Sequence, residues 1–242
     1  MQINPIILLT CCVDPKDMIM TALTDKEQRK QQYYEAFDYY LKETDCRIVI
    51  VENTGFIIDS KYLNNSRIEY LTFEGNNFDK TKGKGYGELL ILEYALKNSK
   101  TIKLSINAPI IKVTGRLKIL SILQHLKQLR KAKNPGVFAD LNINFRFAFS
   151  YFFVADTLFF EKYFFNYRDI LNDTEGFYFE HALAEATKNY ISDGNFFTHL
   201  LNPIDVYGYS GTTGQHYVVD KGLIKTLKIK IKYLYFKGKY IL

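Results

Sequence analysis

PIILLTCCV, residues 5–13, is a short uninterrupted apolar run of the kind found in a strand buried on both faces of a sheet. Beyond it, β-rich runs alternate with segments whose apolar residues recur at helical spacing. This alternation predicts an α/β fold with a mostly parallel, Rossmann-like central sheet flanked by helices. Strands are expected at 5–13, 47–52, 68–73, 110–115 and within the β-rich stretch 143–155, and helices at 25–44, 86–98, 116–132, 156–167 and 176–190.

In such sheets, ligands bind beyond the carboxyl ends of the strands. The residues that end three of the expected strands should therefore surround one crevice. These residues are Thr10, Cys11, Glu52, Asn53, Thr114, Gly115 and Arg116.

The stretch KGKGYGELLILEYAL, residues 82–96, places glycines and lysines directly before an apolar helix expected to begin near Tyr86. Glycines let the backbone approach a ligand closely, and helix N-terminal amides favour an anion. Lys84, Gly85, Gly87 and Glu88 are therefore candidates for contact with a diphosphate. The stretch matches neither a P-loop nor a dinucleotide fingerprint, and a solvated turn before an amphipathic helix is the equally weighted alternative.

The strand IIKVTGR, residues 110–116, delivers Lys112, Thr114 and Arg116 towards the same crevice. A guanidinium there could pair with a phosphate through two hydrogen bonds. The alternative is an ordinary strand-to-helix turn with a solvated arginine.

In GFYFEHALAEA, residues 176–186, Glu180 and His181 fall in the first turns of an expected helix. The helix dipole keeps a carboxylate ionised there, so Glu180 could accept a proton from a hydroxyl as a general base. In the alternative reading, Glu180 only caps the helix and His181 packs against aromatic neighbours.

Several classes of site have no support in the sequence. The chain has no Asp-x-Asp pair, no Cys/His cluster and no Gly-x-Ser-x-Gly elbow. Its three cysteines are read as reduced thiols, and no signal peptide or membrane-spanning run is recognised, so a cytoplasmic location is expected.

The charge of +6 is concentrated at the C-terminal end. Residues 221–242 contain seven lysines and no acid, which leaves the rest of the chain at about −1. A nearly neutral body argues against nucleic-acid binding. The tail reads as an amphipathic helix or as a strand, and we expect it to anchor the protein at an anionic membrane surface. The alternative is a closing element of the fold with solvated lysines.

In their order and spacing, IILLTCCVDP, IVIVENTG, GKGYGELLILEYAL, IIKVTGR and FYFEHALAEA resemble the small GT-A-type glycosyltransferases of bacterial capsule and lipopolysaccharide gene clusters. The resemblance spans residues 5 to about 190. It implies one GT-A-like domain over 1–220, with a nucleotide-sugar-binding part at 1–133 and an acceptor-binding part at 134–220. The basic tail, 221–242, would follow this domain.

The resemblance further implies transfer of a sugar from a nucleotide-sugar to a hydroxyl of a growing surface glycan, free or lipid-linked, at the inner face of the cell membrane. Glu180 matches the position of the base in inverting members, and His181 stands where many of those members have Asp. Asp140 and Asp156 are the next candidates for an alternative base or an acceptor contact.

The largest departure from the family pattern is the missing Asp-x-Asp, which in most members holds Mn²⁺ or Mg²⁺ on the donor diphosphate. Arg116 and Lys84 could neutralise the leaving phosphate instead, so no metal cofactor is expected. A catalytically inactive glycosyltransferase-like binding subunit remains the alternative function. A nucleotidyltransferase or methyltransferase is less favoured, because the early Gly-x-Gly that they usually need is absent.

Overall fold

The computed structural model describes residues 4–105, 108–132, 136–217 and 222–240. The two predicted boundaries, near 133 and 220, lie outside the described residues.

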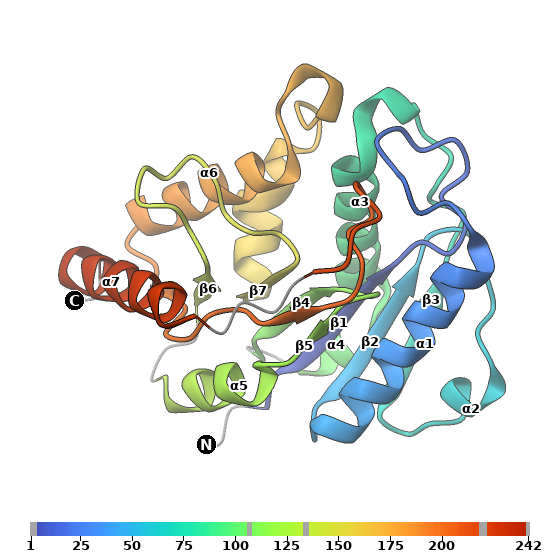
Figure 1. Ribbon diagram of the computed structural model, residues 1–242, viewed down its shortest axis with the longest axis horizontal. Helices are drawn as coiled ribbons and strands as arrows, with labels where there is room; N and C mark the ends of the chain where they lie inside the picture. Colours follow the sequence, from blue (N-terminus) through green and yellow to red (C-terminus); the bar gives the residue numbers. More distant parts are fainter. Residues whose placement is uncertain (1–3, 106–107, 133–135, 218–221, 241–242) are drawn as a thin grey trace.

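A seven-stranded sheet in the order β3-β2-β1-β4-β7-β6-β8 forms the centre of the molecule (Figure 1). The first four strands in this order are parallel to one another. β7 is antiparallel to both of its neighbours, β4 and β6, and β6 and β8 are parallel. The predicted α/β architecture with a mostly parallel sheet is therefore confirmed. The strands are β1 (Ile6–Cys11), β2 (Arg47–Glu52), β3 (Ile68–Thr72), β4 (Ile110–Thr114), β6 (Val137–Ala139), β7 (Phe152–Ala155) and β8 (Phe197–His199).

Helices cover both faces of the sheet, and each face has its own apolar core. Alternate residues of β1 point to opposite faces, so Ile6 and Leu8 join one core while Ile7 and Leu9 join the other. The first core includes α3 (Gly83–Asn98) and α6 (Phe179–Ser192), and the second includes α1 (Lys26–Glu43) and α5 (Ile122–Lys131). The short helices are α2 (Ser60–Leu63) and α4 (Lys100–Leu104).

Three predicted segments differ in detail. α3 begins at Gly83, so the expected glycine turn forms the first turn of the helix. The helix expected from residue 116 begins only at Ile122, because β5 (Lys118–Ile119) first pairs with β9 (Val206–Tyr207). The segment 156–167 is helical as expected, but it is wound mainly as a π-helix over Phe159–Phe164.

The tail forms α7 (Leu223–Tyr240), so the strand reading was wrong and the helix reading is confirmed. One face packs on the body: Ile229 and Phe236 are buried, and the Phe236 ring lies 5.2 Å from that of Phe197 on β8. Lys232 Nζ lies 2.8 Å from Asp140 Oδ1 and anchors the same face. The opposite face carries an apolar stripe that is 52–71% exposed, made of Ile224, Leu227, Ile231 and Leu234.

Candidate functional site

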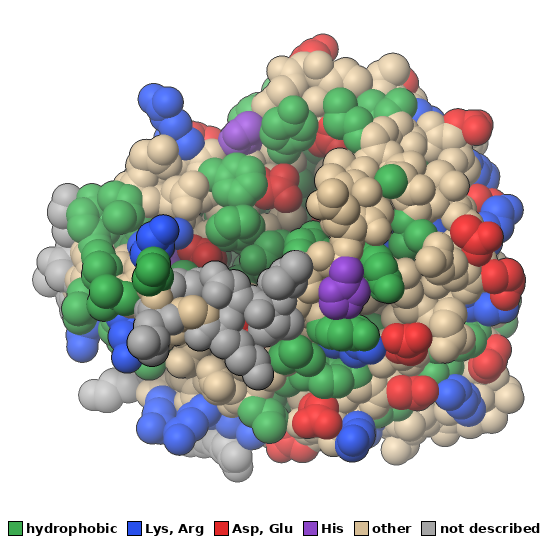
Figure 2. Space-filling view, viewed as in Figure 1, with side chains coloured by type: hydrophobic (Ala, Val, Ile, Leu, Met, Phe, Trp, Pro, Cys, Tyr) green, Lys and Arg blue, Asp and Glu red, His purple; other side chains and the backbone are tan. Residues whose placement is uncertain are grey.

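A cleft of about 450 Å³ lies beyond the carboxyl ends of β1, β2 and β4, between the first turns of α3 and α6. Figure 2 shows a hollow in this face, with hydrophobic side chains along its border. The structure brings ten of the predicted residues to this cleft: Thr10, Cys11, Asn53, Lys84, Gly85, Gly87, Glu88, Thr114, Arg116 and Glu180. The other predicted residues lie outside its lining: Glu52, Lys112, Gly115, His181, Asp140 and Asp156.

The floor of the cleft is built on an ion pair between a buried lysine and a partly buried glutamate. Lys112, fully buried on β4, places its Nζ 2.7 Å from Glu88 Oε1 on α3. Glu88 also accepts hydrogen bonds from Thr10 Oγ1 at 2.6 Å and Thr114 Oγ1 at 3.3 Å. Lys112 donates to the Ser150 carbonyl at 2.5 Å. Both charges are therefore satisfied within the protein, and Lys112 supports the cleft from below.

Glu52 stabilises the loops after β1 and β2. Its buried carboxylate accepts hydrogen bonds from the backbone amides of Val13, Thr54 and Phe56, at 2.8–3.0 Å. A carboxylate with this many donors has little capacity left for a ligand. Glu52 therefore lies outside the cleft lining and contacts the protein, and its predicted contact with a nucleotide stays a prediction.

Gly115 also has a packing role. Its amide donates to the Thr10 carbonyl at 2.9 Å, and a Cβ at this position would lie 2.7 Å from both that oxygen and Cys11 Sγ. The glycine therefore lets the end of β4 approach the end of β1, and it lies outside the cleft lining.

At the start of α3, where the sequence predicts contact with a diphosphate, the structure has a carboxyl group of the protein, that of Asp173. Asp173, whose carboxyl is buried against the first turn, accepts a hydrogen bond from the Gly85 amide at 3.4 Å. Gly83 has φ +80°, and a Cβ there would overlap the Asp173 carboxyl. Burial raises the pKa of Asp173, an effect partly offset by the Gly85 amide and Lys84. Sequence reasoning missed Asp173 because no motif connects it with a helix about ninety residues earlier.

Lys84 borders the cleft from the first turn of α3. Its Nζ donates to the Met20 carbonyl at 3.2 Å and to Thr212 Oγ1. Burial lowers the pKa of Lys84, and the carboxylates of Asp173, Glu180 and Glu88 offset part of this effect. Met20 and Thr212 also belong to the cleft lining, so these hydrogen bonds hold the ammonium at the border of the cleft.

Arg116 lies at the same cleft and is 7% exposed. Its Nη1 donates to Gln32 Oε1 at 3.0 Å and to the Tyr209 carbonyl at 3.2 Å. Its buried Nε has no hydrogen-bond partner among the described residues. This Nε has almost no accessible surface, so any contact between Arg116 and a ligand would be made by the part of the guanidinium that lines the cleft.

Glu180 reaches the cleft from the start of α6 and accepts a hydrogen bond from Ser150 Oγ. His181, the next residue, lies outside the cleft lining. Its Nδ1 accepts a hydrogen bond from the Tyr178 amide at 3.2 Å and caps the helix. The two adjacent candidates therefore have different surroundings. Glu180 lines the cleft, and His181 caps the N-terminus of α6.

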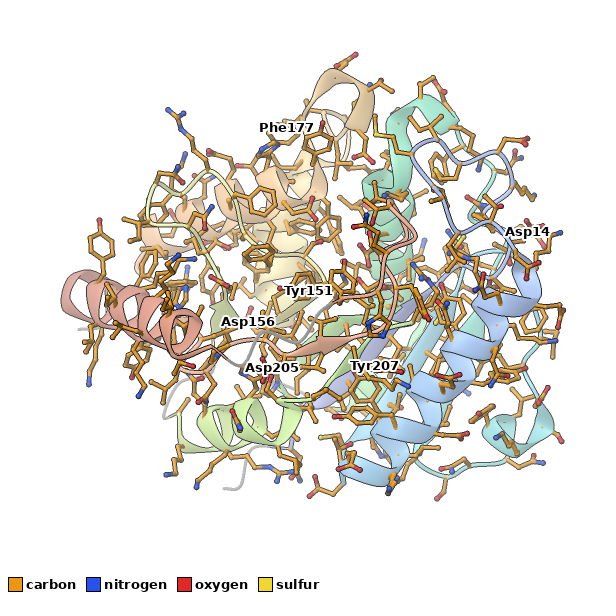
Figure 3. The ribbon with its side chains drawn as sticks, viewed as in Figure 1. Asp14, Tyr151, Asp156, Phe177, Asp205 and Tyr207 are labelled. Atoms are coloured by element: carbon orange, nitrogen blue, oxygen red, sulfur yellow. The ribbon has the colours of Figure 1, made fainter. Side chains whose placement is uncertain are left out.

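Asp140 and Asp156 are engaged elsewhere. Asp140 lies between Lys232 Nζ at 2.8 Å and His199 Nε2 at 3.2 Å. Asp156, labelled in Figure 3, accepts from the Phe159 amide at 2.7 Å and from Tyr190 Oη at 2.8 Å. Both carboxylates therefore support neighbouring helices, and neither borders the cleft.

The cleft contains further residues that the sequence did not indicate. Tyr209 and Tyr217 reach it from a Gly- and Ser/Thr-rich loop whose composition predicts a turn but not its position. Among the residues that the structure describes, no three His, Cys, Asp or Glu side chains form a group that could hold a metal ion.

Replacing Glu88 with Ala should lower the free energy of unfolding by about 3–5 kcal/mol, because buried Lys112 would lose its carboxylate. Urea unfolding measures the loss. The control is Glu93→Ala on the same helix, whose partly exposed pair with Arg168 should contribute only about 0–1 kcal/mol. The double variant Glu88→Leu with Lys112→Met should recover part of the loss. Equal costs for Glu88→Ala and Glu93→Ala would contradict the prediction.

No protein-family model matches this sequence, and no curated protein matches it. Among solved structures, the chain is similar to a 2.76 Å crystal structure described as a "Putative Glucose-1-Phosphate Thymidylyltransferase" from Bacillus anthracis in complex with a sucrose. The match has a TM-score of 0.45 and 13% identity, and it covers 95% of this chain and 94% of that one. A match at this level establishes neither a family nor an activity for this chain.

Proposed function

We propose that the protein is a glycosyltransferase that moves a sugar from a nucleotide-sugar donor to a hydroxyl of a growing capsule or lipopolysaccharide glycan. The observation that carries the proposal is that positively and negatively charged side chains line the same cleft. Lys84 and Arg116 border it together with the carboxylate of Glu180. The resemblance of the ordered sequence motifs to GT-A-type transferases supports the same reading.

The cations serve the donor in this proposal. A diphosphate would bind to Lys84 and to the guanidinium of Arg116, which line the same cleft. Neutral oxygens from Met20 and Thr212 hold Lys84, and a phosphate would be a stronger acceptor than either. Since the Asp173 carboxyl lies at the start of α3 and accepts from the Gly85 amide, these two side chains rather than the helix terminus would bind the phosphate.

Glu180 serves the acceptor. It takes the proton of an acceptor hydroxyl while that oxygen forms a bond to the anomeric carbon of the donor sugar. The bond from the anomeric carbon to the phosphate oxygen breaks, and its electron pair leaves with the nucleotide. The hydrogen bond from Ser150 Oγ fixes the orientation of the Glu180 carboxylate. Lys84 and Arg116 stabilise the charge that develops on the leaving group.

Replacing Glu180 with Gln should lower transfer by at least about 100-fold, because the amide cannot accept the hydroxyl proton. Donor binding should stay near that of the wild type. The donor is first identified with a thermal-shift panel of UDP, GDP, CMP and dTDP compounds. Transfer is then measured as nucleotide release with lipid-linked glycan extracts.

The matched control is Glu185→Gln on the same helix, where Glu185 pairs with Lys188 away from the cleft lining. Full activity of the Glu180 variant would place the base elsewhere. A wild-type protein that binds nucleotide but never releases it from a sugar would support the alternative of a non-catalytic binding subunit.

Turnover should persist in excess EDTA, because side-chain cations rather than a divalent ion would receive the leaving phosphate. The same release assay checks this expectation, with and without added Mn²⁺. Complete loss of activity in EDTA, restored by Mn²⁺, would show that the donor phosphate depends on a metal.

We further propose that the protein works at the cytoplasmic face of the cell membrane, with α7 as the contact. No helix among the described residues is long and apolar enough to cross a membrane. The exposed stripe on α7 could instead lie in the interfacial region of a bilayer. The segment 221–242 carries lysines and no acid, so an anionic surface is the favoured partner.

The double variant Ile231→Ser with Leu234→Ser should weaken binding to phosphatidylcholine–phosphatidylglycerol vesicles by about tenfold or more, since two exposed apolar side chains are lost. Co-sedimentation at increasing lipid concentration measures the partition. The control is Ile170→Ser, a change at an isoleucine that is 57% exposed elsewhere on the protein. Equal vesicle binding by the wild type, the double variant and the Ile170→Ser control would rule out α7 as the membrane contact.

A further inference from the structure

The segment that links β6 to β7 carries aromatic residues at alternate positions. In the sequence FRFAFSYF, residues 145–152, Phe147, Phe149 and Tyr151 are partly exposed, whereas the intervening Ala148 and Ser150 are buried. The alternation is that of an extended chain with one face towards the core and one outward. The rings therefore form one surface, and the proposed mechanism does not use them.

These rings continue into a longer series that curves around one side of the cleft. Ring centroids are 5.5 Å apart between Phe147 and Phe149, 5.5 Å between Phe149 and Tyr151, and 6.2 Å between Tyr151 and Tyr217. At the other end, Phe147 lies 6.0 Å from His181, which lies 5.3 Å from Tyr178. We call this series the aromatic arc: Tyr178, His181, Phe147, Phe149, Tyr151 and Tyr217.

Both ends of the aromatic arc border the cleft, because Tyr178 and Tyr217 belong to its lining, as does Tyr151 (Figure 3). The residues between its members also reach the cleft. Ser150 lies between two arc residues in sequence, and Glu180 lies between Tyr178 and His181. Tyr178, Tyr151 and Tyr217 therefore border the part of the cleft that holds the proposed base, and Phe147, Phe149 and His181 extend the arc beyond the cleft lining.

The polar groups of the arc suit a ligand with several hydroxyls. Burial raises the pKa of Tyr151 and of Tyr217, so both phenols stay protonated and can donate hydrogen bonds. Glu180 and the tyrosine oxygens supply acceptors beside the ring surfaces. An acyl chain would leave these polar groups without partners, which costs free energy in a partly buried site.

We infer that the aromatic arc is a subsite for a pyranose of the acceptor. The apolar C–H face of the sugar would lie on the rings of Phe149 and Tyr151, and one hydroxyl would be directed to Glu180. This inference rests on the proposed function and names the chemical class of its acceptor. In this inference the segment 145–151 makes the acceptor contact that the sequence had suggested for Asp140 or Asp156, which lie outside the cleft lining.

Saturation-transfer NMR tests the subsite with the methyl pyranosides of glucose, galactose, mannose and N-acetylglucosamine as probes. Saturation should reach ring C–H protons of at least one sugar. Phe149→Leu keeps apolar area but removes the ring, and it should weaken that binding by about tenfold. Phe149→Tyr keeps the ring and should retain binding. Phe196→Ala, at a phenylalanine 43% exposed outside the cleft lining, is the matched control.

Absence of saturation on every sugar would overturn the inference, as would equal losses in Phe149→Leu and Phe196→Ala. Decyl maltoside added as a further probe separates the ligand classes: saturation confined to its alkyl protons would identify a lipid site and overturn the sugar subsite. The nucleotide thermal-shift panel is run on the same variants. Retained nucleotide binding without sugar binding would reject the arc and leave the transferase proposal standing. Sugar binding without any nucleotide binding would support the arc as a sugar site but reject the transferase, and with it the role of that sugar as an acceptor.

Discussion

The ion pair between buried Lys112 on β4 and Glu88 on α3 fixes the helix to the sheet beneath the cleft. Lys112 is fully buried in the sheet, and such a charge is tolerated only with a close partner and further hydrogen bonds, which Glu88 and the Ser150 carbonyl provide. The pair ties α3 to β4, and Thr10 extends the tie to β1. Lys84 precedes Glu88 by four residues on the same helix face, so anchoring Glu88 to the sheet directs Lys84 towards the cleft.

The distribution of charge gives the cleft two chemically different parts. Lys112 neutralises Glu88, and the Asp173 carboxyl lies at the start of α3 and accepts from the Gly85 amide. Lys84 and Arg116 form the cationic part together with Arg29, which donates to the Cys12 and Leu23 carbonyls, whereas Glu180 lies beside Tyr178 of the aromatic arc. In the proposed reaction this asymmetry orients the substrates, because the phosphate goes to the cations and the nucleophilic hydroxyl goes to the carboxylate.

β1, β2 and β4 could be predicted because their cores are continuous apolar runs, and the carboxyl ends of parallel strands meet at one edge. The short strands β6 and β8 were not predicted, because three residues give too little pattern. Local pattern could not show that Glu52 is saturated by backbone amides or that Asp173 fills the start of α3. Those roles depend on partners far away in sequence. The composition of the loop that carries Tyr209 indicates a turn but does not show that Tyr209 and Tyr217 lie at the cleft.

The structure of the tail likewise depends partly on its own sequence pattern and partly on contacts with residues far away in sequence. Its spacing fits either an amphipathic helix or a strand. The helix and the face that packs were decided by distant partners: Phe236 stacks beside His199, and Lys232 pairs with Asp140. Phe236 also lies 5.5 Å from Phe145, at the start of the segment that carries the aromatic arc. α7 is therefore fixed to the body next to the proposed acceptor subsite. Under the proposed function, contact of its outer stripe with a membrane would set the orientation of the cleft relative to a lipid-linked glycan.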